Sequence, residues 1–213
     1  MLDALIPGIQ DQTLSPQDRF GIQTDLYALA RSGHANYVDY LKLLRQAYKQ
    51  EDNLTVWKSI LRQLTDLSSI LDYSTVENIK PLFQHYVRDL LTNIYSKLDW
   101  DPLPNEGLQA AMLRGLILIQ MGVNEHGRTS TEAHKRFEKL LQNESINANT
   151  RAGIYLTVAK RGTVETFEKL KLVREYLFDK REEEFFFSLS VASSTSGYTR
   201  RKYSITNSIM SFR

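Results

Sequence analysis

Histidine is the side chain of this sequence best suited to hold a metal ion or to move a proton near neutral pH. The chain has four: His34, His85, His126 and His134. Two histidines one helical turn apart, with a glutamate between them, can hold zinc and activate its water, but no pair here has that spacing. His126 and His134 are separated by eight positions, and no glutamate completes a triad in the right order. We therefore predict no metal site, and interpret the histidines as surface or capping residues.

Other catalytic patterns are also missing from the sequence. Serine, histidine and aspartate all occur, but no spacing identifies a nucleophile with its base. The ten glycines are scattered and form no phosphate-binding loop. We predict no catalytic residue in this chain.

Arg19 and Arg114 are the two charged residues that most need an explanation. Arg114 follows Leu113 in the most apolar stretch of the chain, where an unpaired guanidinium would be costly. It could face an internal cavity and meet the carboxylate or backbone of a peptide. We favour the alternative, a structural ion pair with an acid on a neighbouring helix, such as Asp18 or Asp25. Arg19 has the same two interpretations.

Four aromatic residues could form patches that bind peptide: Tyr27, Trp57, Trp100 and Tyr155. At helical spacing such residues are more often part of the core, and we predict core positions for them.

Apolar residues at three- and four-residue steps predict that helices position these side chains. The first helix spans 15–33, because Ser15 can cap it and Pro16 suits its first position. In the segment 76–98, Pro81 means that the helix begins near Ile79 or is kinked. The segment 106–121 is apolar on nearly every side, as in a helix surrounded by others. The further predicted helices are 57–71, 130–142, 150–161 and 164–178.

Helical hairpins of this kind favour an all-α fold, a HEAT- or armadillo-like array of antiparallel helix pairs forming a partial α-α superhelix. We expect residues 1–184 to form one helical domain. Residues 185–213 are a divergent, serine-rich basic tail, which we expect to be poorly ordered.

Charge and hydropathy exclude several functions. The net charge is +2, and all 25 acidic residues but only 23 of the 27 basic ones lie before residue 185, so the body is nearly neutral. A basic surface for nucleic acid is therefore not expected. No apolar run reaches the ~20 residues that span a bilayer, and no signal peptide is evident, so we expect no membrane partner and a cytoplasmic location.

Six segments carry a resemblance to a known family. They are S-P-Q-D-R-F-G-I-Q-T-D-L-Y-A-L-A-R-S-G at 15–33, V-D-Y-L-K-L-L at 38–44, T-V-W at 55–57, W-D-P at 100–102, L-R-G-L at 113–116 and Y-L-T-V at 155–158. Together they resemble the C-terminal helical domain of puromycin-sensitive aminopeptidases, which are zinc metallo-aminopeptidases, over residues 14–184. The H-E-x-x-H and G-x-M-E-N motifs of the family's catalytic domain are missing from this chain.

The resemblance implies a fragment of such an enzyme, the helical wall that covers the peptide chamber. The intact family member would use zinc to remove N-terminal residues from peptides. Its partners would be peptide substrates and the catalytic domain, and this chain alone would be inactive. The alternative is an independent HEAT-like scaffold that binds a protein or peptide through its concave face.

Overall fold

The computed structural model of the chain describes residues 2–142 and 144–179. These residues form helices and no strand, so the predicted all-α class is confirmed. The HEAT- or armadillo-like superhelix stays a prediction. The elements are a 3₁₀ helix at Leu2–Ala4, α1 (Ile6–Gln10), α2 (Pro16–Arg31), α3 (Tyr37–Ala47), α4 (Leu54–Leu71), α5 (Ile79–Leu98), α6 (Leu108–Val123), α7 (Gly127–Leu141), α8 (Ala148–Lys160) and α9 (Val164–Asp179).

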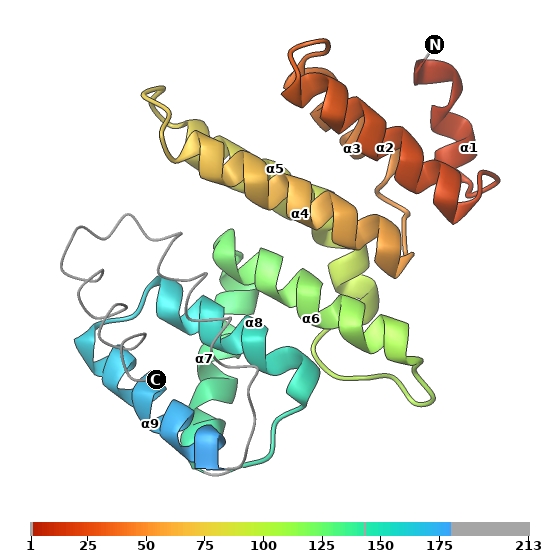
Figure 1. The fold of residues 1–213 in the computed structure, drawn as a ribbon. Coiled ribbons are helices and arrows are strands. Elements are labelled where there is room, and N and C mark those ends of the chain that lie inside the picture. Colours follow the sequence, from red (N-terminus) through yellow and green to blue (C-terminus); the bar gives the residue numbers. More distant parts are fainter. Residues whose placement is uncertain (1, 143, 180–213) are drawn as a thin grey trace. The chain divides into compact units, whose positions relative to one another are not determined.

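The chain divides within α6 into two compact units, one ending at Ile117 and the other starting at Leu118. In the first unit, α2 packs against α3 and α4, while α4 and α5 form a long hairpin (Figure 1). In the second unit, α8 packs against both α7 and α9. The predicted boundary after residue 184 lies outside the described residues, as does the tail 185–213.

Polar residues at the helix starts explain several of the observed boundaries. The backbone N–H of Asp18 donates to the Ser15 hydroxyl at 3.2 Å, and Pro16 occupies the first turn of α2, as predicted. Helix α5 begins at Ile79, so Pro81 lies in its first turn, where it removes no helical hydrogen bond.

Several helix starts differ from the sequence-based expectation, including those of α7 and α8. Helix α7 begins at Gly127, three residues before the predicted start, because the side chain of His126 accepts from the N–H of Thr129. Histidine is not among the preferred N-capping residues, so the sequence pattern did not predict a helix start at Gly127. Helix α8 is capped by Asn147, whose side chain accepts from the N–H of Asn149.

Each unit has its own apolar core. In the first unit, Trp57, Tyr40 and Leu44 have no exposed surface. In the second, Ala133, Ile154 and Val158 are equally buried, and Phe137, Leu170 and Val173 extend this core. Burial of these side chains is the main favourable contribution to folding.

Two glycines allow α6 and α8 to approach closely in the second unit. A Cβ added at Gly122 would overlap the hydroxyl of Thr157 and lie 2.9 Å from its Cβ. A Cβ at Gly153 would lie 3.0 Å from the Cβ of Leu118. The absence of a side chain at both positions therefore sets the distance between the helices.

Candidate functional site

Arg19, one of the two predicted site residues, lies on the first turn of α2 and forms a buried ion pair. Its Nε and Nη2 donate to the two carboxylate oxygens of Glu51 at 2.7 and 3.0 Å. The side chains are only 4% and 1% exposed. A third donor, Nη1, reaches the carbonyl oxygen of Leu14 at 2.6 Å. The hydrogen bond with Glu51 raises the pKa of Arg19.

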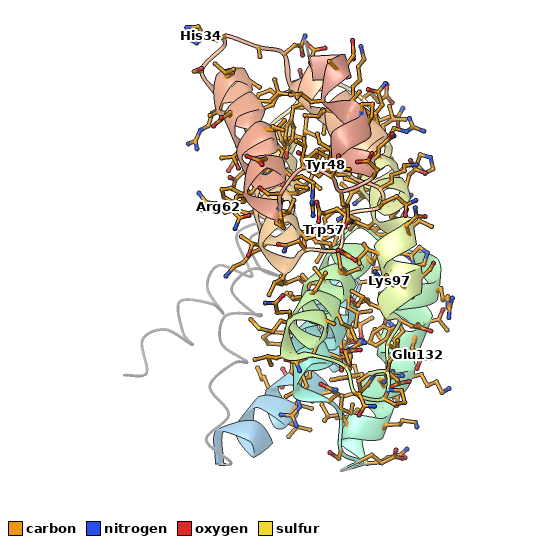
Figure 2. The ribbon with its side chains drawn as sticks, turned by 90° about the vertical axis from the view of Figure 1, so that its right-hand side faces the viewer. His34, Tyr48, Trp57, Arg62, Lys97 and Glu132 are labelled. Carbon is orange, nitrogen blue, oxygen red and sulfur yellow. The ribbon has the colours of Figure 1, made fainter. Side chains whose placement is uncertain are left out.

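Glu51 organises the connection between α3 and α4. Besides Arg19, its carboxylate accepts the backbone N–H groups of Asp52 and Asn53 at 3.1 and 2.9 Å. Its carbonyl oxygen accepts the indole N–H of Trp57 at 2.8 Å. Tyr48 donates to the carbonyl oxygen of Arg19 at 2.7 Å, and both aromatic side chains point into the first unit (Figure 2). Burial raises the pKa of the Tyr48 hydroxyl, which stays a donor at any ordinary pH.

Arg114, the second predicted site residue, forms a similar pair from α6. Nη1 and Nη2 donate to the two carboxylate oxygens of Glu106, and the side chains are 1% and 8% exposed. Nε donates to the carbonyl oxygens of Leu98 and Asp99 at 3.0 and 3.2 Å. The hydrogen bonds from Arg114 hold the pKa of Glu106 below its usual range.

The partner of Arg114 differs from the two that were expected. We named Asp18 and Asp25 as candidate partners of Arg114, but the carboxylate it contacts belongs to Glu106. Asp18 instead accepts a hydrogen bond from the hydroxyl of Ser15 at 2.7 Å. Glu51 and Glu106 were both missed. Glu51 lies in a loop outside the predicted helices, and Glu106 was taken as the first residue of the helix predicted for 106–121, whereas α6 begins at Leu108. Their position next to a helix end was the only available signal.

The four aromatic candidates are buried, as the core interpretation predicted. Trp57, Trp100, Tyr155 and Tyr27 are 0%, 3%, 3% and 7% exposed. Burial raises the pKa of Tyr155 to about 12. These side chains are therefore not available to form an exposed aromatic patch in the isolated chain.

The structure places the described histidines apart from any metal-binding cluster. His126 caps α7, while His34 lies in the exposed turn after α2 and points outward (Figure 2). Among residues 2–142 and 144–179, no group of three or more histidine, aspartate or glutamate side chains could hold a metal ion. The described residues therefore offer no set of ligands that fits a zinc ion. In the same part of the chain, no helix is long and apolar enough to cross a membrane.

Comparison with protein families matches the ERAP1-like C-terminal domain over residues 1–184. The chain belongs to this family, and its all-helical fold agrees with that assignment. The relatives identify it more narrowly as a C-terminal domain of the M1 aminopeptidases.

Three relatives illustrate the match. Aminopeptidase M1-D of Oryza sativa subsp. japonica is 31% identical over 157 residues, which are 73% of this chain and 18% of that protein. Alanine/arginine aminopeptidase of Saccharomyces cerevisiae is 26% identical over 163 residues, 76% of this chain and 19% of that protein. Puromycin-sensitive aminopeptidase of Caenorhabditis elegans is 26% identical over 176 residues, 82% of this chain and 18% of that protein. The chain thus spans about a fifth of the length of these relatives.

Proposed function

We propose that this chain forms the helical wall that covers the peptide chamber of a zinc metallo-aminopeptidase. The observation that carries the proposal is the family match over residues 1–184, together with the three relatives above, each of which is named an aminopeptidase. In the intact enzyme the wall would limit access to the chamber. The partners of this chain would then be the catalytic domain and peptide substrates.

The division of labour follows from the residues present. Zinc would be bound, and its water activated, by the catalytic domain, which carries the H-E-x-x-H motif that this sequence lacks. Arg19 and Arg114 would keep the wall in shape rather than contact peptide, because their donors are directed to glutamates and backbone carbonyls. A cytoplasmic location and the lack of a nucleic-acid partner also belong to this proposal.

A chimera tests the proposal. The matched segment of the Caenorhabditis elegans puromycin-sensitive aminopeptidase is replaced by this chain, or, as the control, by a glycine–serine linker of the same length. We expect the chimera to hydrolyse aminoacyl-coumarin substrates and to lose this activity with a chelator. The linker control should be poorly folded, or should admit large inhibitors that the chimera excludes.

A chimera that behaves like the linker control would contradict the proposed role. Stable monomeric folding of the chain in that case would favour the alternative, an independent scaffold that binds a protein or peptide. Comparing the chimera with the linker control therefore distinguishes two cases: a domain that functions within the enzyme, and a domain that has acquired another function.

A further inference from the structure

Helix α6 is more exposed than its sequence predicts. Arg114 is the only charged residue between Leu108 and Val123, and it is buried and paired with Glu106. A helix that is apolar on nearly every side is normally covered on every side. Leu108 and Met112 are nevertheless 73% and 45% exposed, and they lie one turn apart on the same face of α6. The first turns of this helix therefore present an apolar face that carries no charge.

The loop that precedes α6 adds a third exposed apolar residue. Leu103 is 63% exposed and starts a turn closed by a hydrogen bond from the N–H of Glu106 to its carbonyl oxygen at 3.1 Å. Pro104 and Asn105 are the central residues, and the positive φ of Asn105, 63°, fits a type II turn. Leu103, Leu108 and Met112 are called the 103–112 patch below.

This loop is held in one conformation. Asp99 has φ 46° and ψ −159°, a backbone region that side-chain-bearing residues rarely adopt. Such strain persists only where the surroundings impose it, and here Arg114 binds the carbonyl of Asp99 at one end of the loop and the carboxylate of Glu106 at the other. Trp100 is 3% exposed and anchors the same segment. The loop that carries Leu103 is therefore rigid. Less conformational entropy is then lost when this loop binds a partner.

We propose that the 103–112 patch is the surface that contacts the catalytic part of an M1 aminopeptidase. This inference rests on the proposed function. About four-fifths of each relative's chain lies outside the segment that this chain matches, so a domain in that context has a large neighbour available to cover an apolar face. Apolar side chains on a rigid loop and on the first turns of α6 fit an apolar protein surface, and exposed apolar patches commonly mark such contacts.

A second exposed apolar group supplies a matched control. Ile70, Tyr73, Val76 and Leu82, at the α4–α5 connection, are 54–90% exposed. Charged residues accompany them, including Asp72 and Lys80, which form an ion pair at 2.7 Å. Among the described contacts, no buried arginine forms hydrogen bonds that hold this connection. We therefore assign the contact to the 103–112 patch rather than to this group.

The experiment measures binding of the full chain to the Caenorhabditis elegans enzyme from which the matched segment has been deleted, by isothermal titration calorimetry. The test variant is Leu103→Ser/Leu108→Ser, and the control is Val76→Ser/Leu82→Ser, whose side chains have comparable exposure. We expect the test variant to raise the Kd about tenfold or more and the control to change it less than about twofold. Met112→Lys is a second probe that keeps a good helix former in α6.

The possible results separate the two proposals. The patch is supported if the wild-type chain binds and both the test variant and Met112→Lys weaken that binding. The unfolding midpoints of the free chains should be unchanged. Wild-type binding that neither variant weakens overturns the patch and leaves the proposed function intact. No binding of the wild-type chain contradicts the proposed function itself, and with it this inference.

Discussion

At the scale of single residues, the two arginine–glutamate pairs solve the same structural problem. In each, an arginine on a helix reaches a glutamate in a loop with two hydrogen bonds and uses a further donor for backbone carbonyls. Buried charges are tolerated when their hydrogen-bonding capacity is used in this way. The pairs therefore fix loop conformations, which apolar packing alone does not specify.

The first prediction concerns the coupling between Arg114 and Glu106. Arg114→Leu should lower the free energy of unfolding by about 3 to 5 kcal/mol, because it leaves the carboxylate of Glu106 without its partner. Adding Glu106→Gln should recover part of that loss. A double-mutant cycle from urea unfolding measures the interaction energy. Additive effects of the two substitutions would show that they do not act as a pair.

The exposed pair between Arg161 and Glu125 is the control for this cycle. Their side chains are 63% and 31% exposed, so solvent screens the interaction. Arg161→Leu should change the free energy of unfolding by about 1 kcal/mol or less. An equally large effect at both pairs would mean that burial does not set the strength of the interaction.

The second prediction concerns the pH dependence of stability. Hydrogen bonds from Arg114 lower the pKa of Glu106 in the folded chain below its ordinary value of 4.5. The unfolded chain therefore binds the proton more readily, so this contribution to stability is complete above the ordinary pKa and is lost as pH falls through the lowered value. Urea unfolding at pH 6, 4 and 3 should show a steeper loss for the wild type than for Glu106→Gln. Parallel losses would exclude Glu106 as a source of acid sensitivity.

At the scale of elements, close helix packing depends on where side chains are absent. Gly122 on α6 faces Thr157 on α8, whose hydroxyl donates to the carbonyl of Gly153 at 2.6 Å. At Gly21 on α2, by contrast, a Cβ would meet no atom within 4 Å beyond the adjacent residues and the backbone of its own helix. Glycine at position 122 is therefore needed for the close packing of α6 on α8, whereas at position 21 of α2 there is room for a side chain.

The third prediction compares these two glycines. Gly122→Ala should lower the free energy of unfolding by about 1 to 3 kcal/mol, because α6 and α8 must separate to admit the methyl group. Gly21→Ala should raise it by about 0.5 to 1 kcal/mol, since alanine loses less backbone entropy in a helix. Thermal unfolding followed by circular dichroism measures both. Thr157→Ala should partly rescue Gly122→Ala, and equal stabilisation by both glycine substitutions would contradict the packing of α6 on α8.

At the scale of the whole molecule, the chain corresponds to a helical domain of proteins whose chains are much longer. It matches the ERAP1-like C-terminal domain over residues 1–184 but spans about a fifth of the relatives' lengths. The residues that would perform peptide hydrolysis in the family belong to motifs that this sequence lacks. In the proposed function, its contribution to activity is made through contacts with the catalytic domain and enclosure of the peptide chamber.

The fourth prediction is that the isolated chain has no aminopeptidase activity. Incubation with aminoacyl-coumarin substrates and added zinc should give no turnover above the rate without protein. The intact Caenorhabditis elegans relative serves as the positive control. Turnover that copurifies with the chain and disappears with a chelator would contradict the prediction.

The sequence by itself determined the family and most of the described helices, although α1 and α3 were not predicted. Ser15 and Pro16 start α2 through local hydrogen bonding and a fixed φ, and the buried aromatic positions follow from helical periodicity. Tertiary structure decided what depends on distant residues: Glu51 and Glu106 as partners of the buried arginines, and the contact of Gly122 with Thr157. Periodicity records which face of a helix is apolar, whereas partners across loops and helices are set by how the packed elements bring separate parts of the chain together.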